Sequence, residues 1–148
     1  MRKLVLLVED NPSDEKLTLR ALSKAGVASE VAVARDGVEA LEFLWLHGPT
    51  SPTDADLPAI VLLDLKLPRV DGLEVLRRIR ADIRTQLVPV IVLTSSTLDE
   101  DRLAAYSMGA NAYVRKQVDF SAFVAAAQTL GDFWLRLNEP PPATRGSP

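Results

Sequence analysis

The chain has 148 residues, of which 47% are hydrophobic, and its formal net charge is −3. This length and composition suit one domain with a sizeable core, and a slightly acidic chain lacks the basic field that nucleic-acid binding uses. The absence of cysteine excludes disulfides and cysteine-based zinc or redox sites. No apolar run is long enough for a signal peptide or a membrane span, so we expect a soluble cytoplasmic protein.

Five short apolar runs alternate with helical segments along the chain. Most of these runs lack polar alternation, which is typical of strands buried on both faces of a parallel sheet. In chain order the predicted strands are Leu4–Val8, Val31–Ala34, Ile60–Leu63, Val90–Leu93 and Ala110–Val114.

Residues that favour helix ends lie between these runs. Gly26 and Gly109 predict the ends of the first and fourth helices. Capping residues, a proline at a first helical position and acidic first turns predict the helix starts. The predicted starts are Asn11-Pro12, Asp36–Glu39, Asp71–Glu74 and Thr97–Glu100, and the last helix spans about Asp119–Leu137.

This alternation predicts an α/β fold, a doubly wound five-stranded parallel sheet of the flavodoxin-like kind, with the strand order 2-1-3-4-5. Residues 1–138 would form the single domain, with an extended last helix. Residues 47–58 contain one glycine and three prolines and predict a long loop. Residues 139–148 contain four prolines and no apolar cluster, so we expect a disordered tail.

Acidic residues follow the first and third strands. In this strand order, Glu9, Asp10 and Asp64 converge at the carboxyl edge of the sheet, where open parallel sheets bind ligands. Three neighbouring carboxylates repel one another unless a cation neutralises them, and their oxygens suit Mg²⁺. Thr94 and Lys116, after the fourth and fifth strands, would face them with a hydroxyl and a cation. A carboxylate nucleophile, a metal site, a cation and a hydroxyl donor are the groups that phosphoryl transfer onto a carboxylate requires.

With these residues in place, the chain resembles the receiver domain of bacterial response regulators over about residues 3–137. Each matching motif is moderately specific alone, and the four together, in this order, are very specific. The motifs are Leu7–Asn11, Leu62–Gly72, Pro89–Ser95 and Gly109–Lys116.

The resemblance implies a role for each matching acidic position. Asp64 would be the phosphoacceptor, and a sensor histidine kinase would be the donor. Mg²⁺ would be bound by Asp64, by Asp10, by Glu9 directly or through water, and by the main-chain carbonyl of Lys66.

The resemblance also implies a switch. Thr94, Ser95 and Lys116 would bind the phosphoryl group or respond to it, and Tyr113 would be an aromatic switch residue. The chain would be a phosphoacceptor switch protein rather than an enzyme, with autocatalytic phosphotransfer and slow autodephosphorylation. Phosphorylation would change the surface formed by helix four, strand five and helix five.

Two positions depart from the family pattern, namely Lys66, two residues after Asp64, and Gln117. Family members usually have proline after the conserved lysine, often with a cis bond, whereas Gln117 follows Lys116 here. A cis non-prolyl bond costs about 2.5–4 kcal/mol. Either this chain holds that strain or the loop takes a different path.

Further segments are similar to stand-alone receivers that are paired with phytochrome-type sensor kinases. They are Glu9–Asp14, Ala34–Leu44, the proline-containing loop before the third strand, and the long last helix with Phe133-Trp134. We therefore expect a kinase of that type as the partner.

The last helix carries apolar residues at spacings of three and four, which suit either the core or an interface. They are Phe123, Ala127, Leu130, Trp134 and Leu137. This stripe exceeds what one sheet edge needs, so we predict a homodimer with Phe133, Trp134 and Leu137 near the contact.

Two other functions use similar features. An aspartyl phosphatase would need a second aspartate two residues after the nucleophile, where Lys66 lies. A flavodoxin-like cofactor binder shares the topology, but Glu9 and Asp10 would repel a phosphate in the absence of a metal.

Overall fold

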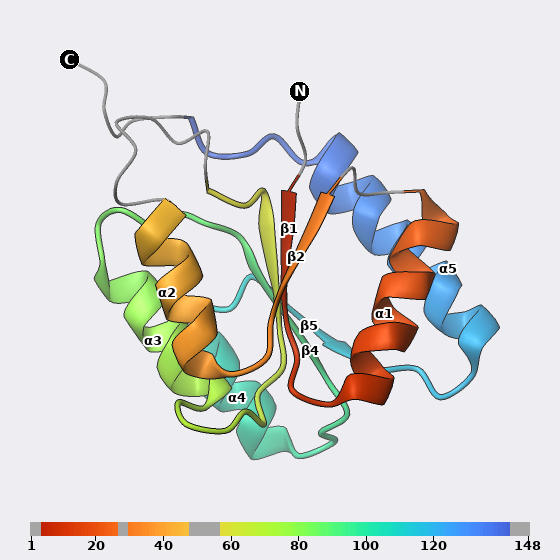
Figure 1. Cartoon of the computed structure of the whole chain (residues 1–148), viewed down its shortest axis with the longest axis horizontal. Helices are drawn as coiled ribbons and strands as arrows, with labels where there is room; N and C mark the ends of the chain where they lie inside the picture. Colours follow the sequence, from red (N-terminus) through yellow and green to blue (C-terminus); the bar gives the residue numbers. More distant parts are fainter. Residues whose placement is uncertain (1–3, 27–29, 48–56, 143–148) are drawn as a thin grey trace.

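The computed structural model describes residues 4–26, 30–47 and 57–142, and in it five strands alternate with helices (Figure 1). The predicted α/β class and the strand order are confirmed. The elements are β1 Leu4–Val8, α1 Pro12–Ala25, β2 Glu30–Ala34, α2 Gly37–His47, β3 Ile60–Leu63, α3 Gly72–Ala81, β4 Val90–Thr94, α4 Asp99–Ser107, β5 Ala112–Arg115, α5 Phe120–Gly131 and the π-helical η2 Asp132–Leu137.

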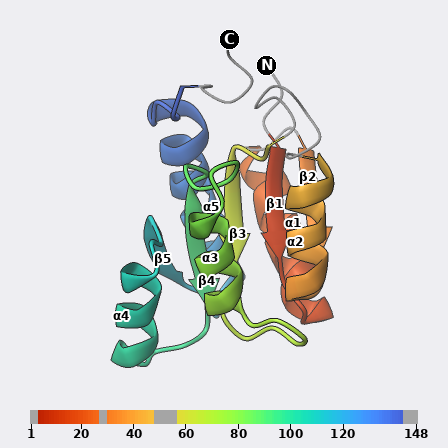
Figure 2. The same cartoon turned by 90° about the vertical axis from the view of Figure 1, so that its left-hand side faces the viewer.

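All neighbouring strands of the sheet are parallel, in the order β2-β1-β3-β4-β5 (Figure 2). Helices α1 and α5 cover one face, and α2, α3 and α4 lie on the other (Figure 1). Because successive side chains of a strand point to opposite faces, both faces of the central strands must be apolar.

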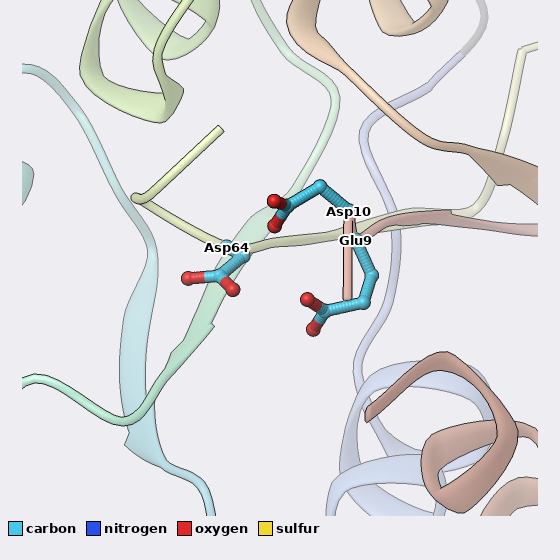
Figure 3. Close-up of side chains that lie close together, drawn as sticks. All are labelled: Glu9, Asp10 and Asp64. Atoms are coloured by element: carbon cyan, nitrogen blue, oxygen red, sulfur yellow. The ribbon is translucent and has the colours of Figure 1, made fainter. Parts of the chain in front are cut away.

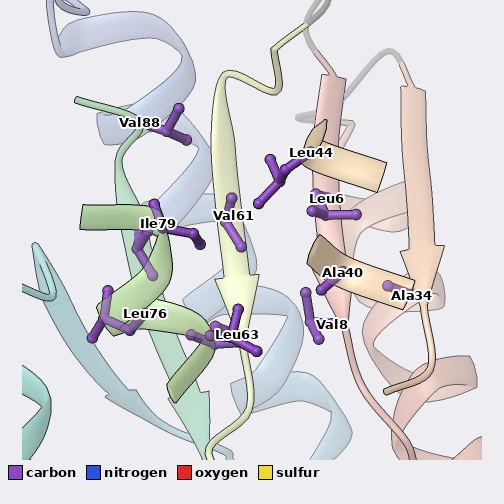
Figure 4. Packing of buried hydrophobic residues seen from close by; sticks show 12 residues of the cluster. Leu6, Val8, Ala34, Ala40, Leu44, Val61, Leu63, Leu76, Ile79 and Val88 are labelled. Carbon is purple, nitrogen blue, oxygen red and sulfur yellow. The ribbon is translucent and has the colours of Figure 1, made fainter. Parts of the chain in front are cut away.

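Strand β1 illustrates this two-sided burial. Val5 and Leu7 pack in the core under α1 and α5. Leu6 and Val8 pack on the other face with Leu44 and other residues of α2 and α3 (Figure 4). The sheet is therefore a rigid central layer, and its loops at the carboxyl edge can place side chains accurately.

Most predicted helix ends are confirmed by their capping bonds. The side chain of Asn11 accepts from the backbone of Ser13 and Asp14 at the start of α1. Gly26 closes α1 with φ 66°, a left-handed conformation that glycine adopts without strain. Asp36 and Asp71 each accept a backbone N–H three residues later.

The predicted capping box at Thr97–Glu100 is wrong. Helix α4 has Leu98 at its N-cap, without a side-chain capping bond from that residue. The hydroxyl of Ser96 accepts from Leu98 N (3.2 Å) and donates to Asp101 (2.6 Å) instead. The cap therefore comes from the residue before the predicted one.

Two predicted elements differ by more than a one-residue change at an end. Strand β5 begins at Ala112, two residues late, because Ala110 N donates to Ala105 O at the end of α4 and Asn111 bonds to Val90. The last helix is not one uniform α-helix. After Gly131 it widens into η2, where Asn138 N donates to Phe133 O, five residues back (2.6 Å).

Parts of the predicted loop and tail lie outside the described residues, namely 48–56 and 143–148, so the disordered tail stays a prediction. Residues 138–142 form no helix or strand. Within the described ranges, no helix has the length and apolar character needed to cross a membrane.

Candidate functional site

The site lies where β1 and β3 end side by side. Asp64 N donates to Val8 O (3.1 Å), and Glu9 N donates to Ala34 O (2.9 Å), so sheet pairing continues through both residues. This pairing fixes the backbones from which the acidic side chains project. Glu9 and Asp64 are buried, and Asp10 is exposed.

The carboxylates of Glu9, Asp10 and Asp64 face a common space (Figure 3). One carboxylate oxygen from each residue can be chosen so that all three lie within 4.8 Å of one another. The prediction that these acids converge is correct. Their hard oxygen donors, two of them buried, fit a small divalent cation such as Mg²⁺.

Lys116 brings a positive charge to the same space. Its ammonium donates to Glu9 Oε1 (2.6 Å), Asp14 Oδ2 (2.8 Å) and Asp64 Oδ2 (3.0 Å). Its side chain is only 9% exposed. The three N–H donors of the ammonium thus have three different carboxylate partners.

Asp14 was missed as a site residue by the sequence reasoning, which placed it only in the first turn of α1. Its spacing from Glu9 and Asp10 held a signal, because a first-turn residue of α1 lies beside the end of β1. The side chain of Asp14 is 37% exposed, compared with 1% for Glu9 and 8% for Asp64.

The electrostatics favour proton retention in the cluster. Burial raises the pKa of Glu9 to about 7, with Asp64 acting in the same direction and Lys116 opposing it. Burial alone would lower the pKa of Lys116, but hydrogen bonds to Asp14 and Glu9, and the charge of Asp64, raise it. Carboxylates outnumber ammonium groups here, so a divalent cation would compete with these protons.

Thr94, at the end of β4, is completely buried. Its hydroxyl accepts from Ser96 N (3.3 Å), and its carbonyl accepts from Lys116 N (2.8 Å). Ser95, predicted to bind or sense the phosphoryl group, is exposed. Through Ser96, the Thr94 hydroxyl is linked to the first turn of α4.

Tyr113 lies on β5 against the small core cluster of Leu65, Val92 and Ala105. Its ring is 6.5 Å from that of Tyr106 on α4, and the two planes are tilted by 35°. Among the described residues, the buried Tyr113 hydroxyl has no hydrogen-bond partner. A buried hydroxyl without a partner favours any rearrangement that gives it one.

The loops on either side of the site have defined conformations. Lys66 N donates to Asp64 Oδ1 (3.3 Å), while the Lys66 side chain points to the exposed surface. Gly72 is required at its position because a Cβ there would overlap the backbone of Asp64 and Leu65. The bond between Lys116 and Gln117 is trans, so the loop accommodates the missing proline by a different path.

Comparison with known families gives one match that covers most of the chain. Residues 5–128 match the model of the response regulator receiver domain. The chain is 40% identical over 138 residues to the probable methanogenesis regulatory protein FilR2 of Methanothrix harundinacea (93% of this chain, 87% of that protein). It is 35% identical over 133 residues to response regulator Rcp1 of Synechocystis (90% and 89%).

Solved structures give the same picture. The phosphorylated cyanobacterial phytochrome response regulator RcpA superposes with a TM-score of 0.85 at 35% identity, covering 96% of this chain and 100% of that one. A Mn²⁺-bound form of Rcp1 gives 0.81 at 34% identity (95% and 99%). The bacteriophytochrome response regulator AtBRR is 49% identical, with a TM-score of 0.71 (94% and 99%).

Proposed function

Because the chain belongs to the response regulator receiver domains, we propose that it is switched by a phosphoryl group transferred from a histidine kinase to Asp64. The observation that carries this proposal is the environment of Asp64. This carboxylate is buried at the end of β3, 3.0 Å from the Lys116 ammonium and close to two further carboxylates. Three carboxylates round one ammonium leave an excess of negative charge, which a divalent cation would neutralise.

Mg²⁺ is the cofactor that the donor set fits. Asp64, Asp10, the main-chain carbonyl of Lys66, and Glu9 directly or through water would hold it. When bound, the ion would neutralise charge on the phosphoryl oxygens during transfer. The Mn²⁺-bound form of Rcp1 supports a divalent ion in a relative of this chain.

The chain's own residues would perform the rest of the transfer. A carboxylate oxygen of Asp64 forms a bond to phosphorus in line with the leaving imidazole, whose nitrogen keeps the electron pair of the broken P–N bond. Lys116 donates to a phosphoryl oxygen. The acyl phosphate that forms is hydrolysed slowly by water, which regenerates Asp64.

The phosphoryl group would change α4, β5 and α5 through Thr94. When the Thr94 hydroxyl turns to donate to a phosphoryl oxygen, it stops accepting from Ser96 N. The Ser96 hydroxyl is bound to α4, and Tyr113 lies between β5 and α4. Phosphorylation thus shifts the population towards another arrangement of this surface.

The proposed partner is a phytochrome-type sensor kinase. RcpA is a phytochrome response regulator and AtBRR a bacteriophytochrome response regulator, and both match nearly the whole chain. FilR2, at 40% identity, is named as a methanogenesis regulatory protein and not as a phytochrome partner. A kinase of another type is therefore the alternative partner. We also propose a cytoplasmic location for the chain.

A homodimer formed through the last helix completes the proposal. Phe133 is 44% exposed and Leu137 is 73% exposed, while Trp134 packs edge-on against Phe133 and reaches the core cluster. Two large exposed apolar side chains beside an anchored tryptophan are typical of an interface.

The test is phosphotransfer profiling against purified, prephosphorylated kinases of several sensor types, with Asp64→Asn as the control. We expect the fastest transfer from a phytochrome-type kinase and none to the Asp64→Asn variant. Equal or faster transfer from an unrelated kinase would contradict the pairing, while label on Asp64→Asn would contradict the acceptor. Multiple turnover of a phosphomonoester would favour the phosphatase alternative.

A further inference from the structure

Of the three described carboxylates that accept from Lys116, Asp14 lies outside the group of three acids facing a common space. That group consists of Glu9, Asp10 and Asp64. Asp14 sits in the first turn of α1, where Asn11 Oδ1 accepts its backbone N–H (3.1 Å). Its side chain approaches the ammonium from the helix rather than from a strand end, at 2.8 Å.

An ammonium group has three N–H donors, and here each has a carboxylate acceptor. Lys116 can therefore bind a phosphoryl oxygen only if one carboxylate gives up its hydrogen bond. The cost of release depends on what then solvates that carboxylate. Water can reach Asp14, which is 37% exposed, much more easily than Glu9 at 1% or Asp64 at 8%.

We propose that Asp14 is a positioning residue that holds Lys116 before phosphorylation and competes with the phosphoryl group for its ammonium. The inference rests on the proposed function and adds that Asp14 controls the equilibrium between the unphosphorylated and the phosphoryl-bound site. Asp14 is the partner that exchanges, because Glu9 is buried and Asp64 itself carries the phosphoryl group.

The charge of Asp14 has opposite effects on the two ligands of the site. Its oxygen and that of Asp64 bind the same nitrogen, so Asp14 is close to any phosphoryl group on Asp64. A carboxylate there repels a phosphoryl dianion and attracts a divalent cation. Removing its charge should weaken cation binding and strengthen phosphoryl binding, whereas damage to the site would weaken both.

The experiment compares wild type, Asp14→Asn and Glu15→Gln. Glu15 is the matched control, because it is the next residue on α1, loses the same charge and pairs with Arg35 instead of Lys116. Calorimetric titration gives the affinity for Mg²⁺ alone, and then for beryllofluoride, a phosphoryl analogue, at saturating Mg²⁺. The lifetime of the acyl phosphate is measured in parallel.

For Asp14→Asn we expect beryllofluoride affinity to rise about two- to fivefold, the range of a partly exposed ion pair, while Mg²⁺ affinity falls. The acyl phosphate should also live longer, and Glu15→Gln should behave as wild type. Unchanged or weaker beryllofluoride binding by Asp14→Asn would overturn the inference. A wild-type chain that binds Mg²⁺ but no beryllofluoride would instead contradict the proposed function, and the inference with it.

Discussion

Glu9 is the residue in which burial and charge are most closely balanced. It is almost completely enclosed, yet it shares a 2.6 Å hydrogen bond with Lys116. Burial raises its pKa to about 7, so the carboxyl changes charge in the physiological range. A cation that binds this carboxylate must displace its proton.

Mg²⁺ affinity should therefore depend on pH. We expect it to increase from about pH 6 to about pH 8, with release of up to one proton per ion. Calorimetry in two buffers of different ionisation enthalpy measures that proton. The Glu9→Gln variant should lose the dependence, and a wild-type affinity that is constant across this range would contradict the assignment.

The same shift affects the stability of the metal-free protein. The folded chain keeps the Glu9 proton up to about pH 7, whereas the unfolded chain releases it near the ordinary value of 4.5. The folded state binds more protons than the unfolded state in this window. The proton on Glu9 therefore adds its full share to the free energy of unfolding below about pH 4.5, and this share is lost as the pH rises to about 7.

At the scale of elements, α4 is attached to the site by Ser96. Ser96→Ala removes the acceptor of Leu98 N and the donor to Asp101. We expect the free energy of unfolding to fall by about 1 kcal/mol, as for loss of a helix cap, with faster amide exchange in α4. Thr97→Ala, at the cap that the sequence predicted, is the control and should change little; a larger loss for Thr97→Ala would contradict the cap.

Arg80 connects the end of α3 by hydrogen bonds to the loops that lead into β4 and β5. Its guanidinium donates to Gly109 O (2.9 Å), Gln86 O (3.0 Å), Val88 O (2.7 Å) and Asn111 Oδ1 (2.7 Å). Burial lowers its pKa from the ordinary value. The side chain joins three segments through carbonyl and amide oxygens.

Arg80→Ala should lower the free energy of unfolding by about 2 kcal/mol, because partly buried carbonyls lose their donors. Urea denaturation measures this loss. Arg78→Ala is the control, since Arg78 pairs with Glu74 at the surface, where ion pairs contribute little. Equal losses for the two variants would show that the Arg80 network adds no stability.

The elements that could be predicted from sequence are those with a local signal. Buried strands read as short apolar runs, and Asn11, Asp36 and Asp71 cap helices as expected. The bonds of Arg80 to Gly109 and Asn111 could not be predicted, because they join residues whose proximity depends on the folded chain. The cap at Ser96 is local, but the neighbouring Thr97 is an equally suitable capping residue type, so the sequence did not distinguish the two. The π-helical turn after Gly131 also left no recognisable sequence pattern.

For the whole molecule, parallel pairing brings the ends of β1, β3, β4 and β5 to one edge, and this arrangement made most of the site predictable. Glu9, Asp10, Asp64, Thr94 and Lys116 each follow or end a strand. Asp14 was not predicted because it comes from the first turn of a helix and not from a strand end, and its short spacing from Glu9 and Asp10 was the one available signal.

The homodimer is a prediction about the whole molecule. Leu137→Glu and Phe133→Glu should each convert the dimer to a monomer, because they place a charge in an apolar contact. Sedimentation velocity over a range of concentrations measures the association. Ile83→Glu is the control, since Ile83 is equally apolar and 74% exposed but lies in the turn after α3. A wild-type mass of one chain at all concentrations would contradict the dimer.

Locating the modified residue distinguishes Asp64 from the neighbouring acids as the carrier of the phosphoryl group. The protein is incubated with Mg²⁺ and acetyl phosphate, the acyl phosphate is reduced with borohydride, and the converted residue is located by mass spectrometry. We predict conversion of Asp64 alone, and none without Mg²⁺. Conversion at Glu9, Asp10 or Asp14 in place of Asp64, or at no residue at all, would contradict the account.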